Sequence, residues 1–198
     1  MSSGVSMSAD SDPIPLSVLD LAPVGVDRSS ADALADTTRL AQTADEFGYA
    51  RFWVAEHHNI PGVASTSPAV LIAHLAAMTH RIRVGSGGVM LPNHLPLVVG
   101  EQFAMLEALH PGRIDLGIGR APGTDPMTAA ALRRGVDTLS AEDFPQHLID
   151  LLGLLGEQGA CLRWGDDRPG ASRSQSGHVH PRRPGELLGL VVTVTDQD

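Results

Sequence analysis

Apolar segments of strand character alternate with segments of helical periodicity along most of this chain, and this alternation most constrains its fold. The pattern repeats four times before it ends near residue 156. Strands that are joined in this way by helices lie parallel, with right-handed crossovers. The sequence therefore predicts an α/β protein with strands over residues 14–21, 49–55, 81–91 and 113–119, and helices over residues 30–47, 68–78, 97–109, 127–134 and 141–156.

Three regions of different composition divide the chain. Residues 1–13 are Ser-rich and acidic, lack the features of a secretion signal, and are expected to be disordered. Residues 14–158 contain the alternating pattern and form the predicted domain. Residues 159–198 are crowded with Arg, Ser, Gly, His and Pro, and within them only residues 187–195 have strand character. We therefore expect an irregular C-terminal tail, which a shift of reading frame in GC-rich DNA near residue 159 or 160 would produce.

Charge and composition exclude several functional classes. The 23 acidic residues outnumber the 14 basic ones, which is unlike a nucleic-acid-binding surface or a polybasic membrane anchor. Every basic residue is arginine, so a lysine Schiff base and a Walker-type phosphate loop are excluded. Cys161 is the single cysteine, which excludes an internal disulfide. No apolar run reaches the ~18 residues of a membrane-spanning helix. The expected location is the cytoplasm.

The segment 49–59 is the strongest candidate for a functional site. It begins as an apolar strand and ends in the polar run Glu56-His57-His58-Asn59. Functional groups in parallel α/β proteins gather at this end of the strands. Because side chains alternate across a strand, His57 and His58 are expected to point to opposite sides. Either one histidine is functional and the other supports the loop, or both are structural polar residues.

Glycines interrupt the third and fourth predicted strands. Gly85-Ser-Gly-Gly88 marks either a bulge, a place where a ligand approaches the backbone, or close packing against a helix. The run from Gly117 to Gly119 lacks the third glycine and the acidic residue of a dinucleotide fingerprint, so a Rossmann fold is not supported. Arg120 follows, and its planar guanidinium group could bind an anionic group or pair with a carboxylate on the surface.

Further polar residues are expected at the same end of the sheet. Asn93 and His94 follow the third predicted strand, and Glu101 lies on the next predicted helix. Titratable groups that converge in one cleft are candidates for substrate contact, although each of these residues also suits a capping or loop role.

No metal site is predicted from the sequence. The zinc-peptidase and serine-hydrolase motifs are absent, and His178 and His180 lie in the irregular tail. A metal-dependent hydrolase that uses Glu56, His57 and His58 is the weakest interpretation, because strand alternation separates the two imidazoles.

Several of these motifs, in unbroken order, resemble the luciferase-like flavin-dependent monooxygenase family, and most closely its single-component bacterial branch. The resemblance covers residues 15–156. The residues that carry it are Leu16–Pro23, Trp53–Asn59, Val84–Asn93, Glu101, Pro111–Arg120 and Asp125-Pro126.

The resemblance implies a barrel that binds reduced FMN, or the deazaflavin F420 in some branches, at the C-terminal ends of its strands. His57 matches the catalytic acid/base of luciferases, and an imidazole with an unperturbed pKa of ~6.5 suits proton transfer near neutrality. Gly87 and Gly88 match a bulge, often with a cis peptide, against which the flavin ring packs. Arg120 matches an arginine that contacts the flavin phosphate. Luciferases carry a reactive cysteine where this chain has Gly119, so light emission is not implied.

The resemblance also implies a small organic substrate, O2 and a flavin reductase as partners. Glu56, His58, Asn93 and Glu101 are then expected to contact the substrate or to support residues that do. A (β/α)8 barrel typically takes ~250 residues, so 198 residues predict a partial TIM (β/α)8 barrel of about four βα units with parallel strands. Its open edges and apolar face predict a homo-oligomer. The alternative is a non-catalytic half-barrel that serves as an interaction module.

Overall fold

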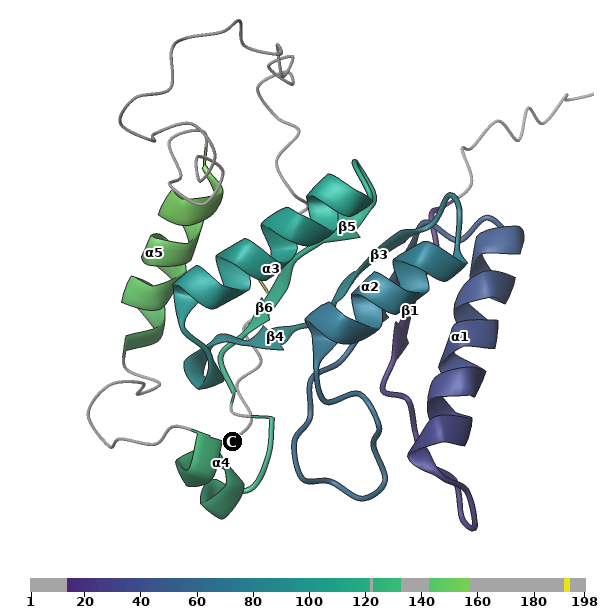
Figure 1. The fold of residues 1–198 in the computed structure, drawn as a ribbon, viewed down its shortest axis with the longest axis horizontal. Coiled ribbons are helices and arrows are strands. Elements are labelled where there is room, and N and C mark those ends of the chain that lie inside the picture. Colours follow the sequence, from purple (N-terminus) through teal and green to yellow (C-terminus); the bar gives the residue numbers. More distant parts are fainter. Residues whose placement is uncertain (1–13, 122, 133–142, 157–190, 193–198) are drawn as a thin grey trace, which may run out of the picture.

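The computed structural model describes residues 14–121, 123–132, 143–156 and 191–192, and strands alternate with helices through most of this part (Figure 1). The strands are β1 (Ser17–Asp20), β2 (Arg51–Val54), β3 (Arg83–Ser86), β4 (Val89–Met90), β5 (Ile114–Asp115), β6 (Gly117–Gly119) and β7 (Val191–Val192). The helices are α1 (Ser30–Glu46), α2 (Pro68–Met78), the 3-10 turn η1 (Leu91–Asn93), α3 (Pro96–Leu109), α4 (Pro126–Leu132) and α5 (Phe144–Leu155).

All the strand pairs are parallel, which confirms the α/β prediction. One sheet has the order β1-β2-β3-β5, so the strands of successive βα units are neighbours, and a second sheet has the order β4-β6-β7. This arrangement is that of part of a TIM barrel, with the C-terminal ends of its strands at one edge.

The sequence predicted that the third and fourth strands are continuous. This prediction was wrong, because the structure divides each of them into two strands. The third ends at Ser86, resumes at Val89, and contains the cis peptide bond Gly87-Gly88 between its halves. A Cβ atom added to Gly88 would lie 2.9 Å from the carbonyl carbon of Ile118. Glycine is therefore required there because the backbone of a strand, β6, approaches closely, whereas the sequence had suggested a bulge, the approach of a ligand or packing against a helix.

The helices begin and end close to their predicted positions. The α2 helix spans the predicted residues 68–78, and α1 begins after a capping box in which Ser29 and Asp32 each accept a hydrogen bond from the backbone of the other. The prediction for the last helix, residues 141–156, is confirmed over Phe144–Leu155, and residues 141–142 lie outside the described part.

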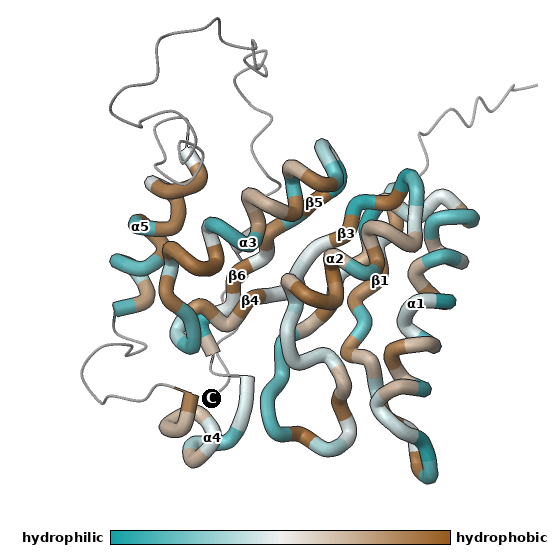
Figure 2. The backbone as a smooth tube through the Cα atoms, viewed as in Figure 1, coloured by the Kyte–Doolittle hydropathy of each residue, from teal (hydrophilic) through white to brown (hydrophobic). Residues whose placement is uncertain are grey.

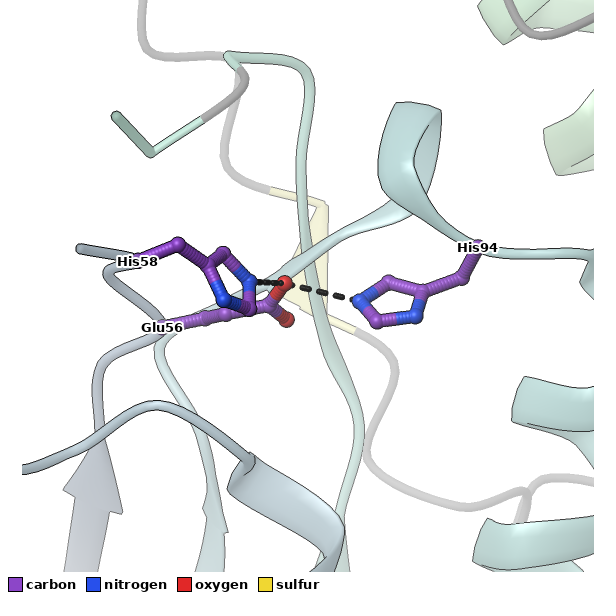
Figure 3. A group of neighbouring side chains, drawn as sticks. All are labelled: Glu56, His58 and His94. Atoms are coloured by element: carbon purple, nitrogen blue, oxygen red, sulfur yellow. Dashed lines mark hydrogen bonds and ion pairs between the residues drawn. The ribbon is translucent and has the colours of Figure 1, made fainter. Parts of the chain in front are cut away.

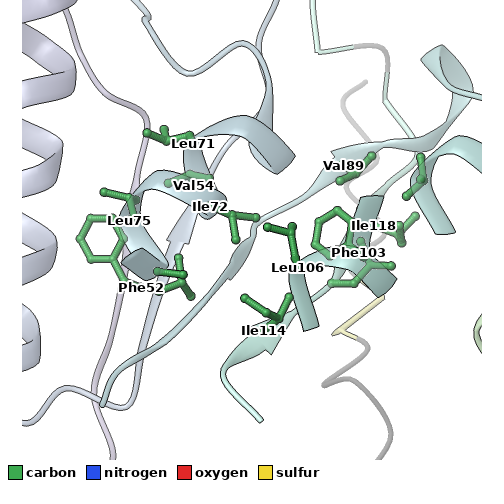
Figure 4. Packing of buried hydrophobic residues seen from close by; sticks show 14 of the residues in the cluster. Phe52, Val54, Leu71, Ile72, Leu75, Val89, Phe103, Leu106, Ile114 and Ile118 are labelled. Carbon is green, nitrogen blue, oxygen red and sulfur yellow. The ribbon is translucent and has the colours of Figure 1, made fainter. Parts of the chain in front are cut away.

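The hydrophobic core lies between the sheets and the helices. Figure 2 shows apolar stretches along the strands and on α3, whereas α1 carries more polar residues. In β2 the alternate residues Phe52 and Val54 are buried against this layer, as the period of a strand requires, whereas β4, β5 and β6 are buried at every position. The packing that Figure 4 shows includes Phe52, Val54, Leu71, Ile72, Leu75, Val89, Phe103, Leu106, Ile114 and Ile118.

The opposite face of the first sheet carries a charged cluster with apolar neighbours. The carboxylate of Asp115 is buried there and accepts hydrogen bonds from Arg51, Trp53 and Arg83. Leu19 lies on the same face and is 54% exposed. Since the core side chains of α1, α2, α3 and α5 pack on the other face, no described helix covers this one.

The described part of the tail is the strand β7, which pairs with β6 through Gly117↔Val191 and Ile118↔Val192. It confirms strand character within the predicted residues 187–195. The remaining residues of the predicted tail, and the predicted disordered residues 1–13, lie outside the described part. Among the helices that are described, none combines the length and hydrophobicity needed to cross a bilayer.

Candidate functional site

Parallel pairing brings the ends of β2 and β3 to the same edge of the sheet. Val54 is the register partner of Ser86, and the backbone N–H of Gly87 donates to the carbonyl oxygen of Val54 over 2.8 Å. The polar run that follows β2 therefore lies beside the Gly87-Gly88 peptide.

A compact polar group of three side chains, the Glu56 group, lies at this edge (Figure 3). The Oε1 atom of Glu56 is 2.7 Å from Nε2 of His58 and 2.7 Å from Nε2 of His94. The other carboxylate oxygen accepts the backbone N–H of Met90 over 3.0 Å. Glu56 is fully buried, whereas the side chains of His58 and His94 are 17% and 32% exposed. Both carboxylate oxygens thus have partners inside the protein.

These partners determine the charge of Glu56. Burial alone would raise the pKa of its carboxyl group, but hydrogen bonds from His94, His58 and the Met90 backbone outweigh burial and lower this pKa below its ordinary value. Glu56 is therefore ionised at neutral pH, and the group places a negative charge between two imidazoles.

A loop from a distant part of the sequence holds the segment that follows β2. The backbone N–H of His58 donates to the carbonyl oxygen of Gly123 over 3.1 Å, and the hydroxyl of Thr124 donates to the carbonyl oxygen of His58 over 2.6 Å. The side-chain amide of Asn59 donates to the hydroxyl of Thr128 at the start of α4. These hydrogen bonds join residues 58–59 to the loop and helix start at residues 123–128, and we call the two joined segments the rim.

Sequence reasoning missed Gly123 and Thr124. Gly123 has a φ angle of +65°, and a Cβ atom there would lie 2.7 Å from the carbonyl oxygen of Glu56. Only glycine fits both the left-handed backbone and the close approach. The dense Gly and Pro residues of the run 121–126 are the signal that could have indicated a structured loop.

His57 lies outside the Glu56 group. Its backbone N–H donates to the carbonyl oxygen of Ser65, and its Nδ1 atom is buried without a hydrogen-bond partner in the described part of the chain. His58 bonds to Glu56 and His57 does not, as expected for side chains that alternate along an extended segment. The imidazole of His57 therefore has a ring nitrogen that a bound molecule could use.

Comparison with known proteins now identifies the family. The family model described as luciferase-like monooxygenase matches residues 14–146, well over half of the chain. The chain belongs to the luciferase-like monooxygenase family.

Three relatives in this family show how much of a whole member the chain represents. It is 59% identical over 136 residues to the protein YvbT of Bacillus subtilis (strain 168), covering 69% of this chain and 40% of that one. It is 50% identical over 139 residues to the luciferase-like monooxygenase of Escherichia coli (strain K12), covering 70% and 41%. It is 52% identical over 120 residues to the N-acetyl-S-alkylcysteine monooxygenase of Bacillus subtilis (strain 168), covering 61% and 36%. The chain thus spans about 40% of the length of its first two relatives.

Solved structures of similar proteins agree with the fold. The chain is similar to apo-MsnO8 with a TM-score of 0.71 and 43% identity, covering 80% of this chain and 48% of that one. Two more distant matches share the fold alone. The first is the oxygenating constituent of 3,6-diketocamphane monooxygenase from Pseudomonas putida in complex with FMN. It is 20% identical with a TM-score of 0.62, covering 72% of this chain and 40% of that one. The second is the coenzyme F420 dependent tetrahydromethanopterin reductase of Methanopyrus kandleri, which is 16% identical with a TM-score of 0.53, covering 73% of this chain and 41% of that one.

The remaining predicted site residues of this luciferase-like chain lie at different positions. Gly87 and Gly88 form the cis peptide that the family resemblance implies. Arg120 is exposed directly after β6, and Asn93 is partly buried at the end of η1. Glu101 is exposed on α3. The structure therefore brings His94 to the Glu56 group and leaves Glu101 on the helix surface.

Proposed function

We propose that this chain carries the flavin-binding and proton-transfer part of a reduced-flavin-dependent monooxygenase that oxidises a small organic substrate. The membership in the luciferase-like monooxygenase family supports the reaction class. Reduced FMN, when bound, supplies the electrons that activate O2, so that one oxygen atom enters the substrate and the other leaves as water. The membership in the luciferase-like monooxygenase family makes FMN the first cofactor to test, and F420 is the second, since the distant structural neighbours include an FMN complex and an F420 dependent enzyme.

The residues at the sheet edge fit such a group. The single observation that carries the proposal is the buried Nδ1 atom of His57, which has no protein partner among the described residues and lies in the run that follows β2, whose last residue, Val54, is hydrogen-bonded to Gly87. A buried polar atom without a partner is costly, and a bound molecule that hydrogen-bonds to it removes this cost.

Each residue has a distinct part in the proposal. His57 holds or releases a proton at Nδ1 towards the reacting atoms. The peptide between Gly87 and Gly88, where Gly87 is half-buried and Gly88 is buried against β6, is the surface on which a flat ring would pack, and Arg120 contacts the phosphate as a cation. Glu56 and His58 of the Glu56 group lie next to His57 in the chain and would support it or contact the substrate. Asn93 contributes a side-chain amide to the same edge.

Flavin binding tests the proposal directly. Purified chain is titrated anaerobically with reduced FMN and reduced F420, followed by absorbance and fluorescence. Saturable binding of reduced FMN, followed by substrate oxidation on admission of O2 in wild type and a loss of at least ~100-fold in His57→Ala, would support it. The N-acetyl-S-alkylcysteine thioethers suggested by the Bacillus relative are the first substrates to try. His80→Ala, which removes an exposed imidazole, is the matched control. Wild-type protein that folds but binds no reduced flavin contradicts the proposal.

The uncovered sheet face supports a second candidate function, association with a second copy of the chain. Leu19 and Leu21 are 54% and 40% exposed beside the strand carrying Trp53. Burial of such apolar area stabilises association by about 25 cal/mol per Å². Light scattering after size exclusion should give a dimer that Leu19→Glu dissociates. Val26→Glu, at a site 91% exposed in a turn, should leave the dimer intact. A monomer at high protein concentration contradicts this candidate.

A further inference from the structure

We propose that Glu56, His58 and His94 bind a divalent transition-metal ion, for which Zn²⁺ is the natural probe. One carboxylate oxygen and two imidazole Nε2 atoms offer three ligands that all lie within 4.8 Å of one another. Two histidines and one glutamate are the protein ligands of a well-known class of mononuclear zinc sites. The site goes beyond the proposed monooxygenase function, which uses His57 and does not need a metal.

The three ligand atoms converge on one point from two segments of the chain. Glu56 and His58 are two residues apart in an extended segment and therefore present their side chains to the same side, and His94 reaches this point from the segment after η1 (Figure 3). The sequence alone offered Glu56, His57 and His58 as metal ligands, and this was its weakest interpretation. In the structure His94 takes the place of His57, which removes the objection that two adjacent imidazoles cannot share a metal.

Metal binding would require both imidazoles to move. Each Nε2 atom is 2.7 Å from the same oxygen of Glu56, as in a hydrogen bond, and the three ligand atoms lie within 4.8 Å of one another. Ligands at ~2.0–2.1 Å from a tetrahedral zinc ion lie about 3.3 Å apart, so each imidazole would retreat from Glu56 by roughly half an ångström and the two Nε2 atoms would adopt this same separation. Both imidazoles are partly exposed.

The protein holds the ligands in place without a metal. The second oxygen of Glu56 accepts the Met90 backbone N–H, and the His58 backbone is hydrogen-bonded on both sides to the loop at Gly123 and Thr124. Fixed ligands lose little conformational entropy on binding, which favours affinity. The negative charge of a fully buried carboxylate adds attraction for a cation.

Access to the site lies on the side of His94. Its side chain is 32% exposed, whereas Glu56 is fully buried. An ion held by three protein ligands would therefore keep one coordination position towards solvent, which a water molecule would fill. The competing interpretation is a purely hydrogen-bonded group, in which both Nε2 atoms keep their protons and no metal binds.

Metal titration of the flavin-free chain distinguishes the two interpretations. We expect one Zn²⁺ per chain by calorimetry, and we expect Co²⁺ to give the visible absorption of a tetrahedral site. Glu56→Gln, His58→Ala and His94→Ala should each weaken binding by at least ~100-fold, since even residues that only support metal ligands contribute 10–100-fold. His57→Ala, which removes the adjacent imidazole, should change the affinity less than about threefold.

Folding of each variant is checked separately. Zn²⁺ should raise the melting temperature of wild type and of His57→Ala, and it should not raise that of His94→Ala. His94→Gln, which keeps a hydrogen-bond donor for Glu56, serves as a second variant if His94→Ala unfolds. Absence of stoichiometric Zn²⁺ binding, or binding that survives loss of both His58 and His94, would overturn the metal site. Neither result bears on flavin affinity, because no flavin is present in the assay.

Discussion

Arg83 donates two hydrogen bonds to the carboxylate of Asp115, on the sheet face that no described helix covers. They run from Nε over 3.0 Å and from Nη2 over 2.5 Å to the same oxygen, and Asp115 is 1% exposed. The pair links neighbouring strands β3 and β5 across their register.

Asp115→Asn should therefore destabilise the chain. Arg51 and Arg83 would keep their positive charges, but the buried side chain at position 115 would no longer carry a negative charge. The free energy of unfolding should therefore fall by roughly 3 kcal/mol. Urea unfolding measures this loss. The control is Asp36→Asn, whose exposed pairs with Arg28 and Arg39 are each worth at most ~1 kcal/mol. Equal effects of the two substitutions would mean that the buried pair contributes no more than a surface pair.

The carboxylate of Asp45 should make stability depend on pH. It accepts the backbone N–H groups of His80, Arg81 and Ile82, and these bonds lower its pKa although burial acts in the opposite direction. Because the folded pKa is the lower one, its stabilisation is present above the unfolded value of ~3.9 and is lost as pH falls below it.

Asp45→Asn tests this dependence. At pH 7 it should cost roughly 2 kcal/mol of unfolding free energy, because the amide keeps only one of the two accepting oxygens and is a weaker acceptor than a carboxylate. The difference between wild type and Asp45→Asn should shrink between about pH 5 and pH 3, as measured by unfolding at each pH. A difference that stays constant over this range would contradict the assignment.

Alanine substitutions at two glycines, Gly85 and Gly153, should change the stability of the folded chain in opposite directions. A Cβ atom on Gly85 would lie 2.5 Å from the carbonyl oxygen of Asp115, and backbone cannot yield there. Gly85→Ala should therefore cost about 1–3 kcal/mol or more. Gly153 lies in α5 with nothing within 4 Å of such an atom, so Gly153→Ala should stabilise by about 0.5–1 kcal/mol. Thermal melts of the two variants compare them directly.

The hydroxyl of Thr124 should stabilise the rim locally. Thr124→Val keeps the shape of the side chain and removes the 2.6 Å hydrogen bond to the His58 carbonyl oxygen, at a cost of about 1 kcal/mol. Hydrogen exchange should become faster at the His58 amide, which donates to the neighbouring Gly123. Thr66→Val, on an exposed loop residue, is the control and should leave this amide unchanged.

The strand and helix alternation was predictable because each element carries its own period and its own end signals. Pro68 at the start of α2 and Ser29 before α1 are local features, and the structure has both helices where these residues place them. The division of the third strand at Gly87 was not predictable in the same way. It depends on the approach of β6, more than twenty residues later in the chain, and this approach leaves no periodic signal.

The candidate site was predictable only in part, for a related reason. The run from Glu56 to Asn59 follows its own strand, so its location could be inferred from one segment. Side-chain alternation separates His57 from Glu56, as the structure has it, but the approach of His94 to Glu56 depends on how two loops meet and could not be predicted from one segment. The hydrogen bonds from Gly123 and Thr124 depend on a third segment in the same way.

The hydrogen bonds between His58 and the loop at Gly123 and Thr124 determine when the site can form during synthesis of the chain. A nascent chain that has released only the segment up to Met90 has the imidazole of His57, whose backbone the Ser65 carbonyl can already hold, but it lacks the partners of His58 in the Gly123 loop. His94 must emerge before the carboxylate of Glu56 gains its second imidazole, and Thr124 must emerge before its hydroxyl can bond to the His58 carbonyl oxygen. The edge that carries the proposed site is therefore completed during synthesis later than the strand that leads into it.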